Sequence, residues 1–147
     1  MGTYAEVEVV VPHVVWVTVV GEPTDESYQA YIDDVAAAFR SQEKFVMLFD
    51  TGGLANLPAR HREMLTQWLA DTEDEFKGRW LGAAFVIRQR MLRGVLSAMY
   101  WLNPPYYPHK VVGSADVGWS WLRDILVDAH LTPPELPSHL SATAGSV

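Results

Sequence analysis

The 147-residue sequence contains no cysteine, so disulfide bonds, thiolate metal sites and cysteine nucleophiles are excluded. Long apolar runs are missing too. Each run is broken by a polar residue or a proline well before the roughly 20 residues needed to span a bilayer. The first residues also lack the basic and apolar regions of a signal peptide. We therefore expect a soluble, cytoplasmic protein with no membrane span.

The chain also has few basic residues, and its net charge of −7 argues against nucleic acid as a partner. The charge is unevenly spread, because residues 76–115 hold six bases and no acid. Such a bipolar chain favours self-association or contact with an acidic partner. The alternative is that opposite charges lie close together in the fold and cancel.

Alternating strand and helix patterns organise most of the chain. The predicted strands cover residues 7–11, 14–20, 45–49, 80–87 and 110–112. The predicted helices begin at Thr24, near Pro58, near Gln89 and at Ser114. The order β-β-α-β-α-β-α-β-α predicts an α/β fold, with a mixed four- to five-stranded sheet and helices mainly on one face. We expect one domain over residues 1–130 and a flexible C-terminal tail over residues 131–147.

One junction between strand and helix stands out. The apolar run from Phe45 to Phe49 is typical of a strand covered on both faces, and Asp50-Thr51-Gly52-Gly53 follows it directly. Parallel sheets place ligands at such ends. A catalytic Asp50 would need a base or metal that nothing nearby in the sequence supplies. A structural Asp50 would accept hydrogen bonds from the glycine N–H groups of the turn, and we favour this role.

With Asp50 closing a central strand ahead of a helix, the chain resembles the STAS domain family, named for sulfate transporters and anti-sigma factor antagonists. The resemblance covers roughly residues 4–129 and is of the SpoIIAA-like, single-domain type. It rests on the strand at 45–50, the apolar strand at 81–87 and a final helix that closely follows a short strand. It implies a regulatory module in bacterial signalling that binds other proteins.

The sequence departs from this family at its phosphorylation motif. Phosphorylated members carry a serine or threonine, usually after an aspartate, at the start of the helix that follows this strand. Here the corresponding residues 55–60 read Ala-Asn-Leu-Pro-Ala-Arg, without a hydroxyl group. Thr51 lies earlier, at the end of the strand, where the expected role is a turn residue that bonds nearby backbone. We therefore expect no phosphoserine switch of the usual kind.

Other catalytic signatures do not occur. The five histidines show no metal-ligand spacing, and no serine lies in a G-x-S-x-G context. The pair Gly52-Gly53 is shorter than a phosphate-binding loop. The sequence therefore predicts no enzyme, no catalytic residue, no metal site and no cofactor.

Aromatic residues gather near the third predicted helix. Residues 91–102 are apolar on nearly every side and lead into a proline-rich loop. A helix of this kind has to be buried on both sides. Either a docking surface or small apolar pocket is built here, or the same side chains seal the core of the sheet. The residues concerned are Met99, Tyr100, Trp101, Tyr106 and Tyr107.

The sequence thus favours a non-catalytic regulatory or scaffolding module that binds another protein or a second copy of itself. One surface would comprise Asp50, Thr51, Gly52 and Gly53 with the helix at 57–78, and the aromatic residues would form a second. The arginines at 88, 90 and 93 are either a solvated basic turn or a contact for an acidic partner. Two alternatives stay open: a carrier of a small apolar ligand or lipid, and a minor enzyme centred on Asp50.

Overall fold

The computed structural model describes residues 3–52 and 58–140. Its five strands form one sheet in the order β1-β2-β3-β4-β5, with β1 antiparallel to β2 and all later neighbours parallel. This confirms the predicted α/β fold with a mixed sheet. The strands are β1 Ala5–Val10, β2 Val14–Val19, β3 Phe45–Asp50, β4 Trp80–Val86 and β5 His109–Val112. The helices are α1 Asp25–Arg40, α2 Ala59–Phe76, α3 Arg90–Leu102 and α4 Ala115–Asp128.

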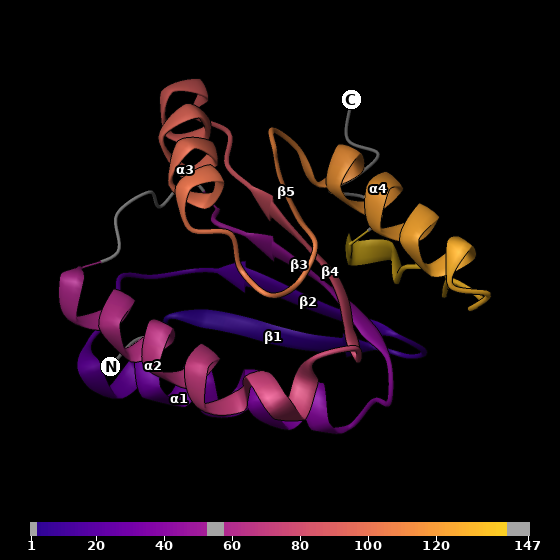
Figure 1. Cartoon of the computed structure of the whole chain (residues 1–147), viewed down its shortest axis with the longest axis horizontal. Helices are drawn as coiled ribbons and strands as arrows, with labels where there is room; N and C mark the ends of the chain where they lie inside the picture. The colour runs from indigo at the N-terminus through magenta and orange to yellow at the C-terminus, as the bar shows by residue number, and fades with distance from the viewer. Residues whose placement is uncertain (1–2, 53–57, 141–147) are drawn as a thin grey trace.

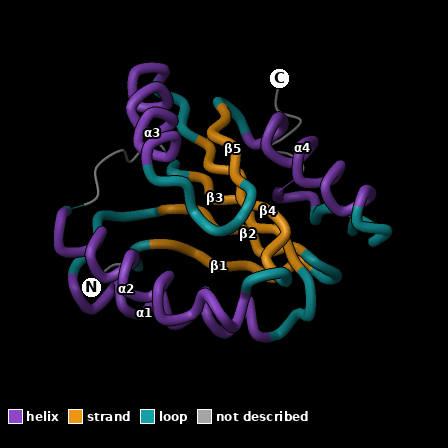
Figure 2. The backbone as a smooth tube through the Cα atoms, in the orientation of Figure 1, coloured by secondary structure: helices purple, strands orange, loops and turns teal. Residues whose placement is uncertain are grey.

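The sheet is covered on both faces because successive side chains of a strand point to opposite sides. Alternate residues of β2, β3 and β4 join the inner faces of α1 and α2 in one apolar cluster, centred on Phe39 and Phe45. The intervening residues, among them Trp16 and Leu48, pack against α4 in a second cluster. Figure 1 shows α1 and α2 together on one side of the sheet and α4 on the other. The backbone trace in Figure 2 shows the strands between these layers.

The segment after α4 also belongs to the second layer. Leu131 and Leu136 pack on the cluster beneath α4, and Leu140 is itself buried. Within the part that the sequence predicts to be a flexible tail, residues 131–140 are therefore anchored by three leucines. Residues 141–147 of that tail lie outside the described residues.

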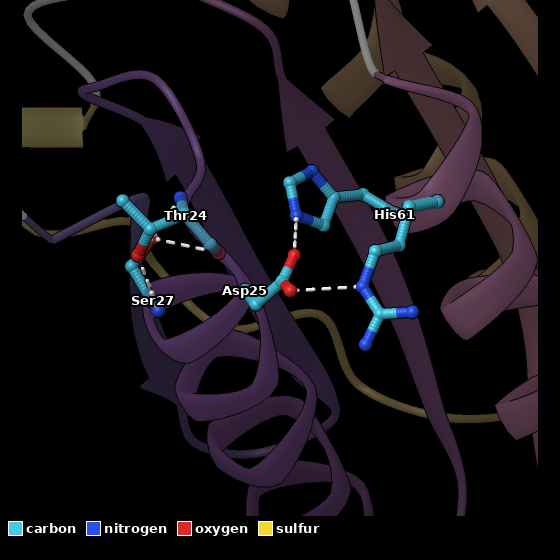
Figure 3. Close-up of polar contacts among 5 residues, drawn as sticks. Thr24, Asp25, Ser27 and His61 are labelled. Atoms are coloured by element: carbon cyan, nitrogen blue, oxygen red, sulfur yellow. Dashed lines mark hydrogen bonds and ion pairs between the residues drawn. The ribbon is translucent and has the colours of Figure 1, made fainter.

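Hydroxyl caps start α1 and α4 at the predicted residues. The Ser27 N–H donates to the Thr24 side chain over 3.0 Å, and the Ser27 hydroxyl oxygen accepts a hydrogen bond from the Thr24 N–H (Figure 3). Ser114 accepts from the Val117 N–H in the same way. Neither α2 nor α3 begins with a side-chain cap. Among the residues that the structure describes, no helix combines the length and the apolar character needed to cross a membrane.

Candidate binding surface

Asp50, the last residue of β3, is buried at the carboxyl end of the sheet with 5% of its surface exposed. Its carboxylate accepts two hydrogen bonds from the Arg88 guanidinium, at 2.6 and 3.1 Å, and a third from the Gly52 N–H at 2.9 Å. The Gly52 contact is the one that a structural Asp50 requires. Arg88 follows the neighbouring strand β4, so the pair ties two parallel strand ends together. This carboxylate is engaged by cationic and N–H donors.

The turn after Asp50 is tightly built. The Thr51 hydroxyl donates to the Val86 carbonyl over 2.9 Å, as expected for a turn residue that bonds nearby backbone. Gly52 adopts φ +64°, and a Cβ at this position would lie 2.5 Å from the Val19 carbonyl oxygen. Only glycine fits this approach of two strand ends. Gly53, predicted to share the surface, lies outside the described residues.

Helix α3 connects β4 to β5 (Figure 1), and none of its residues is fully buried. Its inner side carries Tyr100, whose ring centre lies 5.5 Å from the ring centre of Phe85 and 4.6 Å from that of His109. Burial raises the pKa of Tyr100 to about 12. Tyr100 therefore attaches the helix to the sheet rather than facing solvent.

The outer side of α3 is an exposed apolar surface, which we call the α3 face. Met99 is 52% exposed and Trp101 is 82% exposed, so these two predicted residues are available to a partner. The structure adds three side chains that the sequence did not single out: Met91, Val95 and Leu102. Together with Met99 these residues follow one another at intervals of four, four and three residues, the spacing typical of one helix face. This spacing was visible in the sequence.

The two loop tyrosines lie elsewhere. Tyr107 is 6% exposed and stacks on Trp80 with ring centres 3.8 Å apart and an interplanar angle of 15°. Tyr106 packs edge-on against both rings. Burial raises the pKa of Tyr107 far above that of a free tyrosine and that of Tyr106 to about 12. The structure thus packs Tyr106 and Tyr107 around Trp80 and Tyr100 against the sheet. Met99 and Trp101 are exposed on α3.

A polar contact joins the starts of α1 and α2, and the sequence did not predict it. His61 is 5% exposed, and its Nε2 lies 2.8 Å from one Asp25 oxygen while the Arg60 Nε donates to the other oxygen over 2.8 Å (Figure 3). The His61 ring stacks on Tyr28. The hydrogen bonds from His61, and next from Arg60, lower the pKa of the Asp25 carboxyl. No local sequence pattern links residues so far apart. The contact holds the first turns of α1 and α2 together.

Two of the six bases of residues 76–115 form ion pairs with acidic side chains among the described residues. Lys77 lies 4.0 Å from Glu73, and Arg88 pairs with Asp50. Arg93 donates to the carbonyls of Ile87 and Arg88. Within residues 3–52 and 58–140, no three histidine or acidic side chains are grouped so as to hold a metal ion.

Comparison with known proteins supports the fold. No protein-family model matches this sequence. No curated protein matches it either. The chain is similar in structure to an uncharacterised protein of the DUF3478 family with a SpoIIAA-like fold, from Shewanella loihica PV-4. The TM-score is 0.57 at 15% identity, over 80% of this chain and 91% of that protein. The chain therefore has a SpoIIAA-like fold, as the resemblance to STAS domains implies.

Proposed function

We propose that this chain is a non-catalytic regulatory or scaffolding module that acts by binding another protein through the α3 face. The observation that carries the proposal is the concentration of exposed apolar surface there. Of the ten large apolar side chains exposed in the described residues, five lie on α3. An exposed apolar patch of this kind marks an interaction site more often than a free surface. The SpoIIAA-like fold supports a regulatory role in bacterial signalling and, with it, a cytoplasmic location.

The direction of these side chains favours a protein over a small apolar ligand. A carrier encloses its ligand in a concave, mostly apolar pocket. The side chains of Met91 and Trp101, each 82% exposed, lie open to solvent. Two surface depressions exist, but most of the side chains that line them are polar or charged. An open apolar face suits a partner helix or sheet, whereas the carrier function lacks an enclosed apolar site in the described residues.

A regulatory role here would depend on binding rather than on Asp50 chemistry. The three hydrogen bonds on the Asp50 carboxylate leave it a structural acceptor. The Thr51 hydroxyl is likewise occupied by the Val86 carbonyl. We therefore expect neither residue to act as an acid, a nucleophile or a phosphate acceptor.

The proposal is tested by comparing two exposed valines on different helices. Val95 on α3 and Val127 on α4 are each 52% exposed, so Val95→Glu and Val127→Glu introduce the same charge at equal exposure. Proteins enriched from a lysate of the source organism by the wild type and by Val127→Glu, but lost with Val95→Glu, would support the proposal. An identical set with all three chains would contradict it. A retained apolar ligand in native mass spectrometry would instead favour the carrier function.

A further inference from the structure

The α3 face is continuous and carries no charge. At 100° per residue, Met91, Val95, Met99 and Leu102 fall within about a quarter of the helix circumference. Gly94 and Ala98 lie on the same side, and a Cβ added at Gly94 would meet no atom within 4 Å. The middle of the face is therefore low, which lets a second backbone approach closely. A partner helix can lie along it between the larger side chains.

The charges of α3 are confined to its first turn. Arg93 is turned inward to backbone carbonyls, whereas Arg90 is exposed and has no carboxylate within ion-pair distance among the described residues. The first turn contains no acid and the last turn no base. The positive end of the helix dipole thus carries a cation, and the negative end lacks one. Neither end is compensated by a side chain of α3 itself.

We infer that the occupant of the α3 face is a second copy of this chain, with the two α3 helices antiparallel. This inference rests on the proposed function, since it names the partner of the same surface. In an antiparallel pair, Arg90 of each copy lies beside the uncompensated carboxyl end of the other helix. Met91 of one copy then faces Leu102 of the other, and Val95 faces Ala98. A parallel pair would instead bring the two Arg90 side chains together.

The charges near α3 also favour a second copy over an acidic partner or an anionic surface as the occupant of the α3 face. The basic residues near α3 are mostly engaged, Arg88 by Asp50 and Arg93 by carbonyls. The face that is left is apolar, in a chain whose net charge is −7. An anionic partner would therefore find few free cations here and would gain few ion pairs. A self-complementary apolar face with one cation at one end satisfies both copies equally.

The first test measures association. Sedimentation equilibrium of the wild type should show a monomer–dimer equilibrium with a dissociation constant roughly in the micromolar range, because a single helix face is a small interface. Val95→Glu should weaken the dimer by about tenfold or more, because it buries a charge at the centre of the contact. Val127→Glu should leave it unchanged.

The second test measures orientation. The chain has no cysteine, so any disulfide formed by introduced thiols is unambiguous. Chains carrying Met91→Cys and chains carrying Leu102→Cys are mixed and oxidised. Antiparallel helices predict disulfides between the two kinds of chain. Two Met91→Cys thiols would lie about 16 Å apart along the axis and should not join.

Three outcomes would overturn the inference. The first is a monomer up to about 200 μM, roughly a hundred times a dissociation constant of about 2 μM. The others are equal weakening by the two glutamate variants and disulfides only between like chains. Sedimentation of the wild type with vesicles containing one-third anionic lipid is a further arm. Binding that Val95→Glu and salt both abolish would assign the face to a membrane instead. The lysate comparison decides the proposed function separately, because a monomer that loses its enriched proteins on Val95→Glu still has a protein-binding α3 face.

Discussion

Asp50 and Arg88 hold each other in a two-point ion pair at the carboxyl ends of the neighbouring strands β3 and β4. The carboxylate side chain is 7% exposed and the guanidinium side chain 44% exposed, so the pair lies half in the protein and half in water. The Gly52 N–H adds a third bond to the same carboxylate. The junction that most suggested chemistry in the sequence is therefore a structural contact that holds two strand ends together.

Removing the carboxylate at this contact should destabilise the protein. Asp50→Ala leaves the Gly52 N–H without its acceptor and the guanidinium without its partner, and we expect a loss of about 2–4 kcal/mol in the free energy of unfolding. Arg88→Ala should cost less, because the cation is already partly solvated and water can reach the carboxylate. Urea unfolding followed by circular dichroism measures both. A loss within about 0.5 kcal/mol for Asp50→Ala would show that the pair is not structural.

Two aromatic residues from the predicted group should behave in opposite ways. Tyr107→Ala removes a ring stacked on Trp80 in the core, and we expect a loss of about 3–5 kcal/mol in stability. Trp101→Ala removes an 82% exposed side chain and should change stability by less than about 0.5 kcal/mol. Urea unfolding at a concentration low enough to keep the chain monomeric gives both values. Similar losses in the two variants would refute the division into core and surface.

The contact between α1 and α2 should make stability depend on pH. Because His61 and Arg60 lower the pKa of Asp25 in the folded state, the contact stabilises the fold above the ordinary carboxyl value of about 4. That contribution is lost as the pH falls through the lowered folded value. Wild type should therefore exceed Asp25→Asn in stability at about pH 5, and the difference should shrink toward about pH 3.

The measurement is a series of urea unfolding curves across this pH range. Asp34→Asn, at an exposed position on the same helix, is the matched control and should follow the wild-type profile. A difference between wild type and Asp25→Asn that stays constant down to about pH 3 would contradict the lowered pKa.

Two helical glycines provide another matched pair. Gly94→Ala on α3 adds a methyl group where nothing lies within 4 Å, so the monomer should gain about 0.5–1 kcal/mol from better helix propensity. The same change at Gly118 on α4 places a methyl 3.2 Å from Leu48 and 3.3 Å from Ala84. This variant should show no gain or lose about 1–3 kcal/mol through overpacking. Thermal and urea unfolding compare them, and a stabilised Gly118→Ala would show that α4 can move away from the sheet.

Local patterns were sufficient to predict much of the architecture. The Thr24 and Ser114 caps, the apolar run of β3 and the alternation of strands with helices all depend on neighbours in sequence. The SpoIIAA-like fold follows from that order of elements. Register and packing partners were not predicted, because they depend on which surfaces meet.

The candidate site shows where sequence information ends. Asp50 and Arg88 are 38 residues apart, and Asp25 and His61 are 36 apart, so only the fold pairs them. The apolar character of α3 was visible in the sequence, but not which side faces outward. Nothing in the sequence shows that Tyr107 is buried and Trp101 exposed. Only the stack of Tyr107 on Trp80 in the fold distinguishes them. Gly53, in the predicted surface, lies outside the described residues.

The shallow seating of α3 has a consequence for cooperativity. Helices α1 and α4 bury side chains such as Phe39 and Leu122 completely, whereas α3 buries none of its own. Its local opening should therefore cost less free energy than global unfolding, and its amide protons should exchange with deuterium well before those of α1 and α4. A bound partner would slow that exchange in α3 alone. Helix α3 would then be stable to local opening only when its partner is bound.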